Sequence, residues 1–198
     1  MPRAFTDEEK HRIRQTLMKK GKELLANHGI RKTNVEDLTI AAGISKGAFY
    51  KFYPSKEALF FEILEGLEND MRTAFFGEFL VPGLTPRESF QSKMHGVLSF
   101  IEENPLMGKM NSEEMNHLLR TLPKEMLEAH SKNDDRELSA FVKSWKDEGY
   151  LRDFDPETVA AFLKSMFILA LQKQEIGSEY DRMMKMMIDM AGQYLIRD

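Results

Sequence analysis

The chain of 198 residues contains no cysteine. This absence excludes a disulfide framework, a thiolate metal site and a cysteine nucleophile, and it is ordinary for a protein of a reducing cytoplasm. Long hydrophobic runs are also missing, because the longest unbroken apolar stretch runs only from Met166 to Leu171, far too short to cross a bilayer. The opening residues MPRAFTDEEK hold no apolar segment of the secretory type. We therefore expect a cytoplasmic protein with no membrane partner.

The motifs of catalysis are absent as well, since the sequence holds no serine–histidine–acid arrangement, phosphate-binding loop or HExxH motif. One spacing could offer ligands to a metal: His117 follows Glu113 and Glu114 by four and three residues on a single helix. His95 and His130 would join it only through an unknown fold, and a solvated helix face is the simpler interpretation. We expect no enzyme activity, no metal and no cofactor.

Negative charge exceeds positive charge overall, with a net charge of -4, but the two signs are segregated. Residues 1–60 hold 12 Lys/Arg against 7 Asp/Glu, whereas residues 61–198 hold 16 against 25. A basic first third on an acidic remainder indicates a polyanion contact made by the first third alone. The alternative is that helix surfaces differ in charge by chance.

Convincing strand alternation is absent, and the start and stop signals are nearly all helical. We predict an all-α protein of about nine helices. In the first of them Gly21 lies on the apolar stripe, where it costs about 1 kcal/mol relative to alanine, so we expect another helix to cross closely there. The expected helices cover residues 7–28, 34–42, 45–53, 56–76, 85–104, 106–121, 124–148 and 156–176, with a last helix that starts at 178 or 181 and ends at 195.

The segment AAGISKGAFYKFYPSKE, residues 41–57, sets four aromatic residues among lysines. Helical spacing puts Phe49, Phe52 and Tyr53 on one side, with Tyr50 at its border, and leaves a small basic face opposite. We expect Phe49 and Tyr53 to anchor this helix to the first helix and to the fourth helix, which starts at residue 56. The basic face is then free to contact another molecule.

Two short helices are joined at this point. Thr33 to Glu36 has the form of a capping box, Gly43 supplies a turn, and Ser45 caps the second helix. This pattern predicts a helix-turn-helix at about residues 33–52, whose second helix can lie in the major groove of DNA.

The run TNVEDLTIAAGISKGAFYKFYPSKEALFFEIL, residues 33–64, resembles the DNA-binding domain of the TetR family of bacterial transcriptional repressors. The family pattern is roughly T-x-V-x-x-I-A-x-x-A-G-V-S-x-G-x-L/F-Y-x-H/Y-F-x-S/N-K-E-x-L. GYLRDFDPETVAAF, residues 149–162, is a weaker likeness to the start of the family's penultimate helix. Thr39 departs from the usual alanine, Ile40 from a polar residue and Phe52 from histidine or tyrosine, and we expect Ile40 to pack against a neighbour.

The resemblance implies that residues 45–53 are the recognition helix. Lys46 and Lys51 can donate to guanine or phosphate, Gly47 and Ala48 lack bulk, and Tyr50 can reach a phosphate. Residues at the N-termini of helices favour an anionic oxygen. The candidate DNA-contacting residues are Thr33, Ser45, Lys46, Gly47, Ala48, Tyr50, Lys51 and Lys56.

The last two helices carry broader apolar faces than one subunit needs, which predicts a homodimer with a four-helix interface; the alternative is a deeply buried pair in a monomer. The candidate interface is Phe162, Met166, Leu169, Met183, Met187, Met190 and Tyr194. The middle helices are rich in methionine, which suits an irregular apolar ligand but equally suits ordinary core. The candidate pocket is Phe90, Met94, Leu98, Met107, Met110, Met115, Leu119, Met126, Trp145, Phe162 and Met166.

Together these features predict a DNA-binding domain at residues 1–55 and a helical ligand-binding and dimerisation domain at residues 56–198. The expected function is that of a dimeric repressor, released from a palindromic double-stranded operator by a small, largely apolar effector. The alternatives are a regulator controlled by a protein partner instead of a ligand, and a helical binding protein whose helix-turn-helix is only structural.

Overall fold

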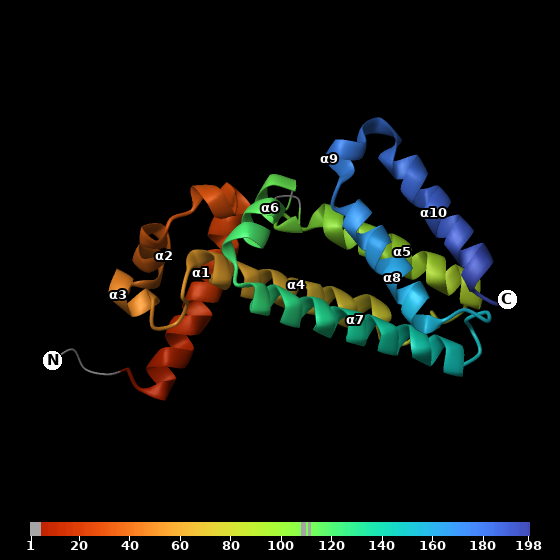
Figure 1. Ribbon diagram of the computed structural model, residues 1–198, viewed down its shortest axis with the longest axis horizontal. Coiled ribbons are helices and arrows are strands. Elements are labelled where there is room, and N and C mark those ends of the chain that lie inside the picture. Colours follow the sequence, from red (N-terminus) through yellow and green to blue (C-terminus); the bar gives the residue numbers. More distant parts are fainter. Residues whose placement is uncertain (1–4, 108–109, 111) are drawn as a thin grey trace. The chain divides into compact units, whose positions relative to one another are not determined.

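A computed structural model describes residues 5–107, 110 and 112–198. Within these residues the regular structure is helical, and the β-type pairing is limited to an isolated antiparallel bridge between Leu151 and Ile196. The predicted all-α fold is confirmed (Figure 1). The elements are α1 (Asp7–Lys32), α2 (Val35–Ala42), α3 (Lys46–Phe49), α4 (Lys56–Phe76), α5 (Pro86–Glu103), α6 (Ser112–Thr121), α7 (Lys124–Asp147), α8 (Pro156–Ala170), α9 (Lys173–Ile176), the 3-10 turn η2 (Gly177–Glu179) and α10 (Tyr180–Leu195).

Helix α3 is shorter than predicted. It ends at Phe49 and residues 50–52 continue as turns, because Pro54 disfavours helical geometry in the residue before it. The first helix was predicted to end at His28, and the structure has a break directly after it at Gly29, which has a φ of 78°; α1 resumes beyond this break and ends at Lys32.

Two other predicted helices are wrong in extent. The helix expected over 106–121 begins only at Ser112, and its positions 108, 109 and 111 lie outside the described residues. The helix expected over 156–176 ends at Ala170 and restarts as α9. The ammonium of Lys173 binds carboxylates of Glu102 and Asp181 at 2.6 and 2.9 Å, so ion pairs with other helices hold this second break. None of the described helices combines the length and the apolarity needed to span a membrane.

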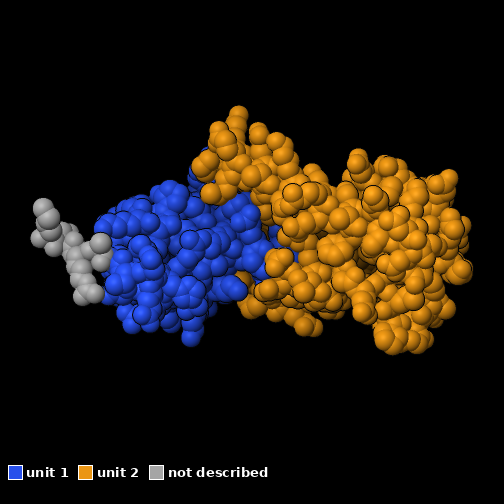
Figure 2. Space-filling model, turned by 90° about the horizontal axis from the view of Figure 1, so that it is seen from below, with its two compact units in different colours: residues 1–68, 112–122 blue, residues 69–111, 123–198 orange. Residues whose placement is uncertain are grey.

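The chain divides into two compact units (Figure 2). One unit is Met1–Glu68 with Ser112–Leu122, and the other is Asn69–Asn111 with Pro123–Asp198. Helix α6 thus packs with α1 in the first unit, although a long stretch of sequence separates the two helices. The functional boundary between residues 55 and 56 stays a prediction.

The first unit is held by a buried apolar core from α1, α2, α3 and α4. At Gly21 a Cβ atom would lie 2.7 Å from Cδ1 of Ile63 in α4, which confirms that another helix crosses closely at this glycine. The fully buried members of this core are Leu17, Leu25, Ile30, Leu38, Phe49, Leu59, Phe60 and Ile63.

In the second unit α7 packs along α8, and α5 packs along α10. Trp145 lies in an aromatic cluster, with its ring centroid 4.9 Å from that of Phe79, 6.3 Å from that of Phe90 and 6.4 Å from that of Phe76. Phe90 and Trp145 were candidate pocket residues, and both are almost fully buried within this packed core.

Two buried aromatic residues next to α3 should respond differently to truncation. Phe49→Ala is expected to lower the free energy of unfolding by about 3–5 kcal/mol, because the cavity would lie among fully buried side chains. Tyr53→Phe is expected to change it by less than about 1 kcal/mol, because the Tyr53 hydroxyl is buried with no hydrogen-bond partner among the described residues. Urea unfolding of both variants measures the difference, and a larger loss in Tyr53→Phe would contradict the packing described.

Candidate DNA interface

The start of α2 is fixed by a reciprocal capping box. The Asn34 side chain accepts from the Asp37 N–H at 2.9 Å, and the Asp37 carboxylate accepts from the Asn34 N–H at 3.1 Å. The predicted box, which began at Thr33, is therefore wrong by one residue. Thr33 is only 1% exposed, and its hydroxyl instead donates to the Gly29 carbonyl at 2.8 Å. Because that hydroxyl is buried and already donates a hydrogen bond within the unit, the expected DNA contact of Thr33 is corrected.

The turn and the start of α3 follow the predicted chemistry. Gly43 adopts left-handed geometry with a φ of 67°, and its N–H donates to the Ile40 carbonyl at 3.2 Å. The Ser45 hydroxyl accepts from the Ala48 N–H at 3.2 Å. These contacts hold α2 and α3 as one helix-turn-helix.

An aromatic layer buries the back of α3. Phe49 and Tyr53 are buried with ring centroids 6.0 Å apart, as the spacing predicted. The Arg14 guanidinium of α1 lies 5.4 Å from the Tyr53 ring centroid and pairs with Glu62 of α4 at 2.7 Å. Burial, with a further contribution from Glu62, raises the pKa of Tyr53 to about 12, so its hydroxyl is neutral at physiological pH.

Ala48 lies on this buried side, not on the outer one. Its small side chain lets α3 pack closely on the core, and the expectation that its lack of bulk lets the backbone approach base edges is corrected. Gly47 lies on the outer side, where an added Cβ would meet nothing within 4 Å.

The front of α3 is exposed and basic. Ser45, Lys46, Tyr50 and Lys51 are exposed beside Gly47. Tyr50 lies edge-on to Phe49, with ring centroids 5.5 Å apart, so its ring is braced while its hydroxyl end can reach outward. The Lys51 ammonium lies 5.9 Å from the ring centroid of Phe5. We call the five residues Ser45, Lys46, Gly47, Tyr50 and Lys51 the recognition surface.

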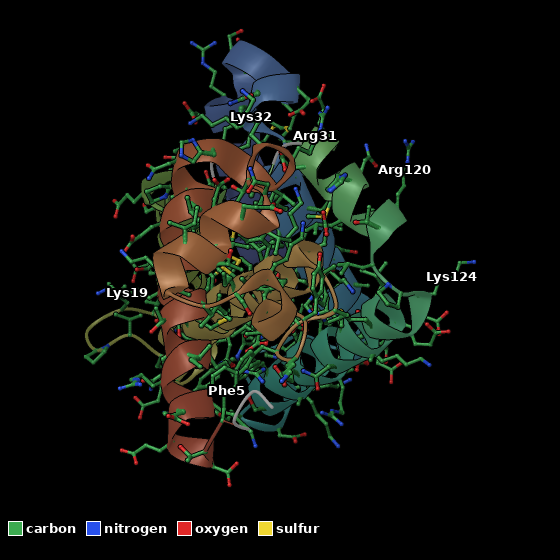
Figure 3. The ribbon with its side chains drawn as sticks, turned by 90° about the vertical axis from the view of Figure 1, so that its left-hand side faces the viewer. Phe5, Lys19, Arg31, Lys32, Arg120 and Lys124 are labelled. Atoms are coloured by element: carbon green, nitrogen blue, oxygen red, sulfur yellow. The ribbon has the colours of Figure 1, made fainter. Side chains whose placement is uncertain are left out.

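Other cations project from the same unit. Figure 3 shows the side chains of Lys19 and Lys32 pointing outward from α1, and that of Arg120 pointing outward from α6. The charge count placed an excess of positive charge in the first 60 residues, but it gave no reason to include Arg120, whose helix joins this unit only through folding.

Lys46 shares its ammonium with an acid that the sequence did not single out. Its Nζ lies 2.5 Å from Oε1 of Glu36, and both side chains are about half exposed. The hydrogen bond to Glu36 raises the pKa of Lys46, and the same bond lowers the pKa of Glu36. An anion that binds Lys46 must therefore displace a carboxylate.

Lys56 is engaged inside the unit. Its ammonium donates to the carbonyls of Thr33 at 2.6 Å, Ile30 at 2.8 Å and Arg31 at 3.4 Å. An ammonium has three N–H donors, and three carbonyls take them. The expected phosphate contact of Lys56 is corrected to a structural one at the end of α1.

The three residues with metal-like spacing each have a different partner. His117 Nε2 lies 3.1 Å from Glu57, Glu113 pairs with Arg31 at 2.7 Å, and Glu114 accepts from backbone N–H groups of α1. The helical spacing is real, but the three side chains do not converge on one point.

Two departures from the family pattern have different outcomes. The Thr39 hydroxyl donates to the Glu36 carbonyl at 3.0 Å, so this polar side chain is satisfied within α2. Ile40 was expected to pack against a neighbour, and this is wrong: it is 80% exposed. It lines an open groove together with Leu24, His28, Lys32, Asp37 and Ala41.

The candidate pocket residues are placed unequally. Met94, Met107, Met110 and Met166 are buried, and Leu98, Met115 and Met126 are half-buried. Leu119 is 53% exposed, because its neighbour Leu118 is the residue that α6 turns inward. Its place in a pocket is therefore corrected.

The candidate dimer residues form an exposed stripe with one exception. Phe162, Met190 and Tyr194 are exposed, and Leu169, Met183 and Met187 are half-buried. Met166 is only 4% exposed and faces the core of its own unit. Ile168 and Met186, each more than half exposed, extend the stripe and were missing from the candidate interface.

A short helix with a buried aromatic back and a small basic front, set by a glycine turn on a second helix, is the arrangement of a helix-turn-helix DNA-binding protein. The model of a family described as bacterial regulatory proteins, tetR family, matches residues 17–63. The HTH-type transcriptional repressor DhaR of a Mycobacterium species is 23% identical, and the alignment covers 83% of each chain. The HTH-type transcriptional repressor KstR2 of Rhodococcus jostii is 26% identical over 75% of this chain and 73% of that protein.

Solved structures share the fold. SmeT, the repressor of the Stenotrophomonas maltophilia multidrug efflux pump SmeDEF, superposes with a TM-score of 0.63 over 93% of this chain and 91% of its own, at 19% identity. A complex of SmeT with triclosan superposes with a TM-score of 0.61 over 94% and 92%, at 17% identity. Residues 17–63 match the tetR family of bacterial regulatory proteins, and the similarity of the chain to these repressors supports a DNA-binding transcriptional regulator.

Removing the acid that competes for Lys46 should strengthen DNA binding. Glu36→Gln is expected to raise operator affinity by roughly two- to fivefold, because the Lys46 ammonium no longer has to leave a carboxylate. Glu23→Gln, which removes a carboxylate paired with Lys20 on α1, is the control and should have a smaller effect. Fluorescence anisotropy with labelled operator measures both, and weaker binding by Glu36→Gln would mean that Glu36 orients Lys46.

Proposed function

We propose that the protein is a homodimeric repressor that binds a palindromic operator through the recognition surface and is released by a small, largely apolar ligand. The observation that carries this proposal is the two-sided construction of α3. Its buried aromatic back leaves no freedom to turn, so Lys46, Gly47, Tyr50 and Lys51 stay on the outer side. Lysine donors beside a residue without a side chain suit the edges and phosphates of the major groove.

Two copies of the surface are needed to recognise an operator. One short helix reads only a few base pairs, whereas a two-fold pair reads two half-sites about one helical turn apart. The exposed apolar stripe on α8 and α10 supports such a pair, since a monomer would leave Met190 and Tyr194 in water at 61% and 67% exposure. In a dimer this stripe forms a closed four-helix contact.

The proposed ligand binds in the second unit. Met94, Met107, Met110 and Met166 give its interior several flexible, polarisable side chains, which can adapt to an apolar molecule. The complex of SmeT with triclosan supports this part of the proposal by likeness of fold. A ligand that favours one arrangement of the dimer would weaken operator binding by its difference in affinity for the two arrangements. No catalytic role is proposed, and the cytoplasm is the compartment in which such a regulator meets DNA.

The proposal predicts that the recognition surface, and not overall charge, determines operator binding. Replacing Lys46 and Lys51 together by methionine is expected to weaken specific binding roughly 100-fold or more, because two donors to bases or phosphates are lost. Replacing Lys124 and Lys143, two exposed lysines of α7, by methionine is the matched control with the same change in charge. Shift assays on DNA from upstream of the protein's own gene test this.

Salt dependence gives an independent reading of the same assay. With about 6–10 phosphate contacts per dimer, wild-type affinity should fall by roughly 10³- to 10⁵-fold between 50 and 200 mM salt. The Lys46/Lys51 variant should show a smaller slope, and the Lys124/Lys143 variant an unchanged one. Equal operator affinity in all three proteins would overturn the assignment of the recognition surface.

The proposed dimer predicts that charge on the apolar stripe separates the subunits. Replacing Met190 and Tyr194 by glutamate is expected to give a monomer, because the two-fold axis would bring the added carboxylates together in a dry contact. Replacing Gln174 and Ser178 by glutamate adds the same charge outside α8 and α10 and should leave the dimer intact. Sedimentation velocity measures the mass, and a dimeric Met190/Tyr194 variant would rule out this stripe as the interface.

A further inference from the structure

The last part of α1 contains a break, and side chains of other helices bind the backbone groups that follow it. We call residues Gly29 to Thr33 the elbow. Gly29 has a φ of 78° and interrupts the helix, so the N–H groups that follow it have no helical carbonyl four residues earlier to bind. Buried backbone donors of this kind need another acceptor.

Glu114 of α6 supplies that acceptor. One oxygen of its carboxylate accepts from the Ile30 N–H at 3.0 Å and from the Arg31 N–H at 3.3 Å. The other oxygen lies so close to Gly29 that an added Cβ would sit 3.1 Å from it. A carboxylate that accepts two N–H groups at the start of a helical turn forms charge-assisted bonds and is favoured by the local dipole.

Lys56 of α4 binds the backbone carbonyls, the hydrogen-bond acceptors, of the same elbow. Its ammonium binds the carbonyls of Ile30, Arg31 and Thr33, while the Thr33 hydroxyl binds that of Gly29. A carboxylate thus holds the donors of the elbow and an ammonium holds its acceptors. The carboxylate comes from a helix outside residues 17–63, the segment that carries the family match.

The elbow determines where the helix-turn-helix begins. Asn34 caps α2 directly after Thr33, and Gly43 and Ser45 then hold α3 to α2. A change of backbone direction at the elbow would therefore move α2 and α3 together, because the contacts within the pair are local.

We propose that Glu114 is a positioning residue for DNA binding, and that operator affinity depends on whether α6 keeps its carboxylate on the Ile30 and Arg31 N–H groups. This inference rests on the proposed function, since it assigns the control of the same surface.

Glu113 provides a matched control for the test. It lies next to Glu114 on α6, and it pairs with the exposed side chain of Arg31 instead of with the backbone. Glu113→Ala and Glu114→Ala remove the same charge from the same helix. Loss of a negative charge near DNA by itself strengthens binding, so long-range electrostatics predict a slight gain for both variants. The positioning role predicts opposite signs.

The experiment uses the full-length dimer and an operator selected from DNA upstream of its own gene. Glu114→Ala is expected to bind at least roughly tenfold more weakly than wild type, and Glu113→Ala equally well or slightly better. Glu114→Gln, which keeps a neutral acceptor, should fall between them and remains informative if Glu114→Ala fails to fold. Operator affinity of Glu114→Ala and Glu114→Gln at or above that of wild type would overturn the proposal.

Hydrogen exchange without DNA separates this inference from the proposed function. The Ile30 and Arg31 amides should exchange faster in Glu114→Ala and unchanged in Glu113→Ala, with the Leu38 amide of α2 as the internal reference. Unchanged exchange at Ile30 and Arg31 would show that Glu114 does not hold the elbow. A wild-type protein with normal exchange that binds no operator would instead overturn the proposed function.

Discussion

The burial of Phe49 and Tyr53 is the interaction on which the rest of this structure depends. Helix α3 is a single turn, and a turn of that length has no stability of its own in water. The aromatic layer, braced by Arg14 and Glu62, fixes which side of α3 faces outward. Because that side is fixed, two lysines and a glycine become a surface of constant shape.

Charge on this surface is organised by contacts more than by composition. Lys46 is paired with Glu36, and Lys56 donates all three of its hydrogen bonds to backbone carbonyls. Both ammonium groups therefore already have partners within the protein. A partly buried ammonium with full hydrogen bonding acts as part of the fold. The ammonium of Lys46 is exposed and paired with a single carboxylate, so an anion that binds it has to displace Glu36.

The two compact units do not follow the order of the sequence, because the first unit includes α6. Helix α6 lies far along the chain, yet Glu113, Glu114 and His117 contact α1 and α4 in the first unit. These three side chains have metal-like spacing, but their partners show that they connect α6 to α1 and α4. On the second unit, the exposed stripe of α8 and α10 remains apolar although water surrounds it, which is the usual mark of a surface that meets another protein.

The sequence by itself determined the all-helical fold, the glycine turn, the Ser45 cap and the buried sides of Phe49 and Tyr53, because each follows from local spacing and capping chemistry. It also located the crossing at Gly21, since a glycine on an apolar stripe leaves room for another helix. Only the tertiary structure decided the partners of Lys46, Lys56 and Glu114, the inward turn of Ala48 and Met166, and the break after Ala170. These depend on which side chains from distant segments arrive at the same place, and no local pattern encodes that meeting.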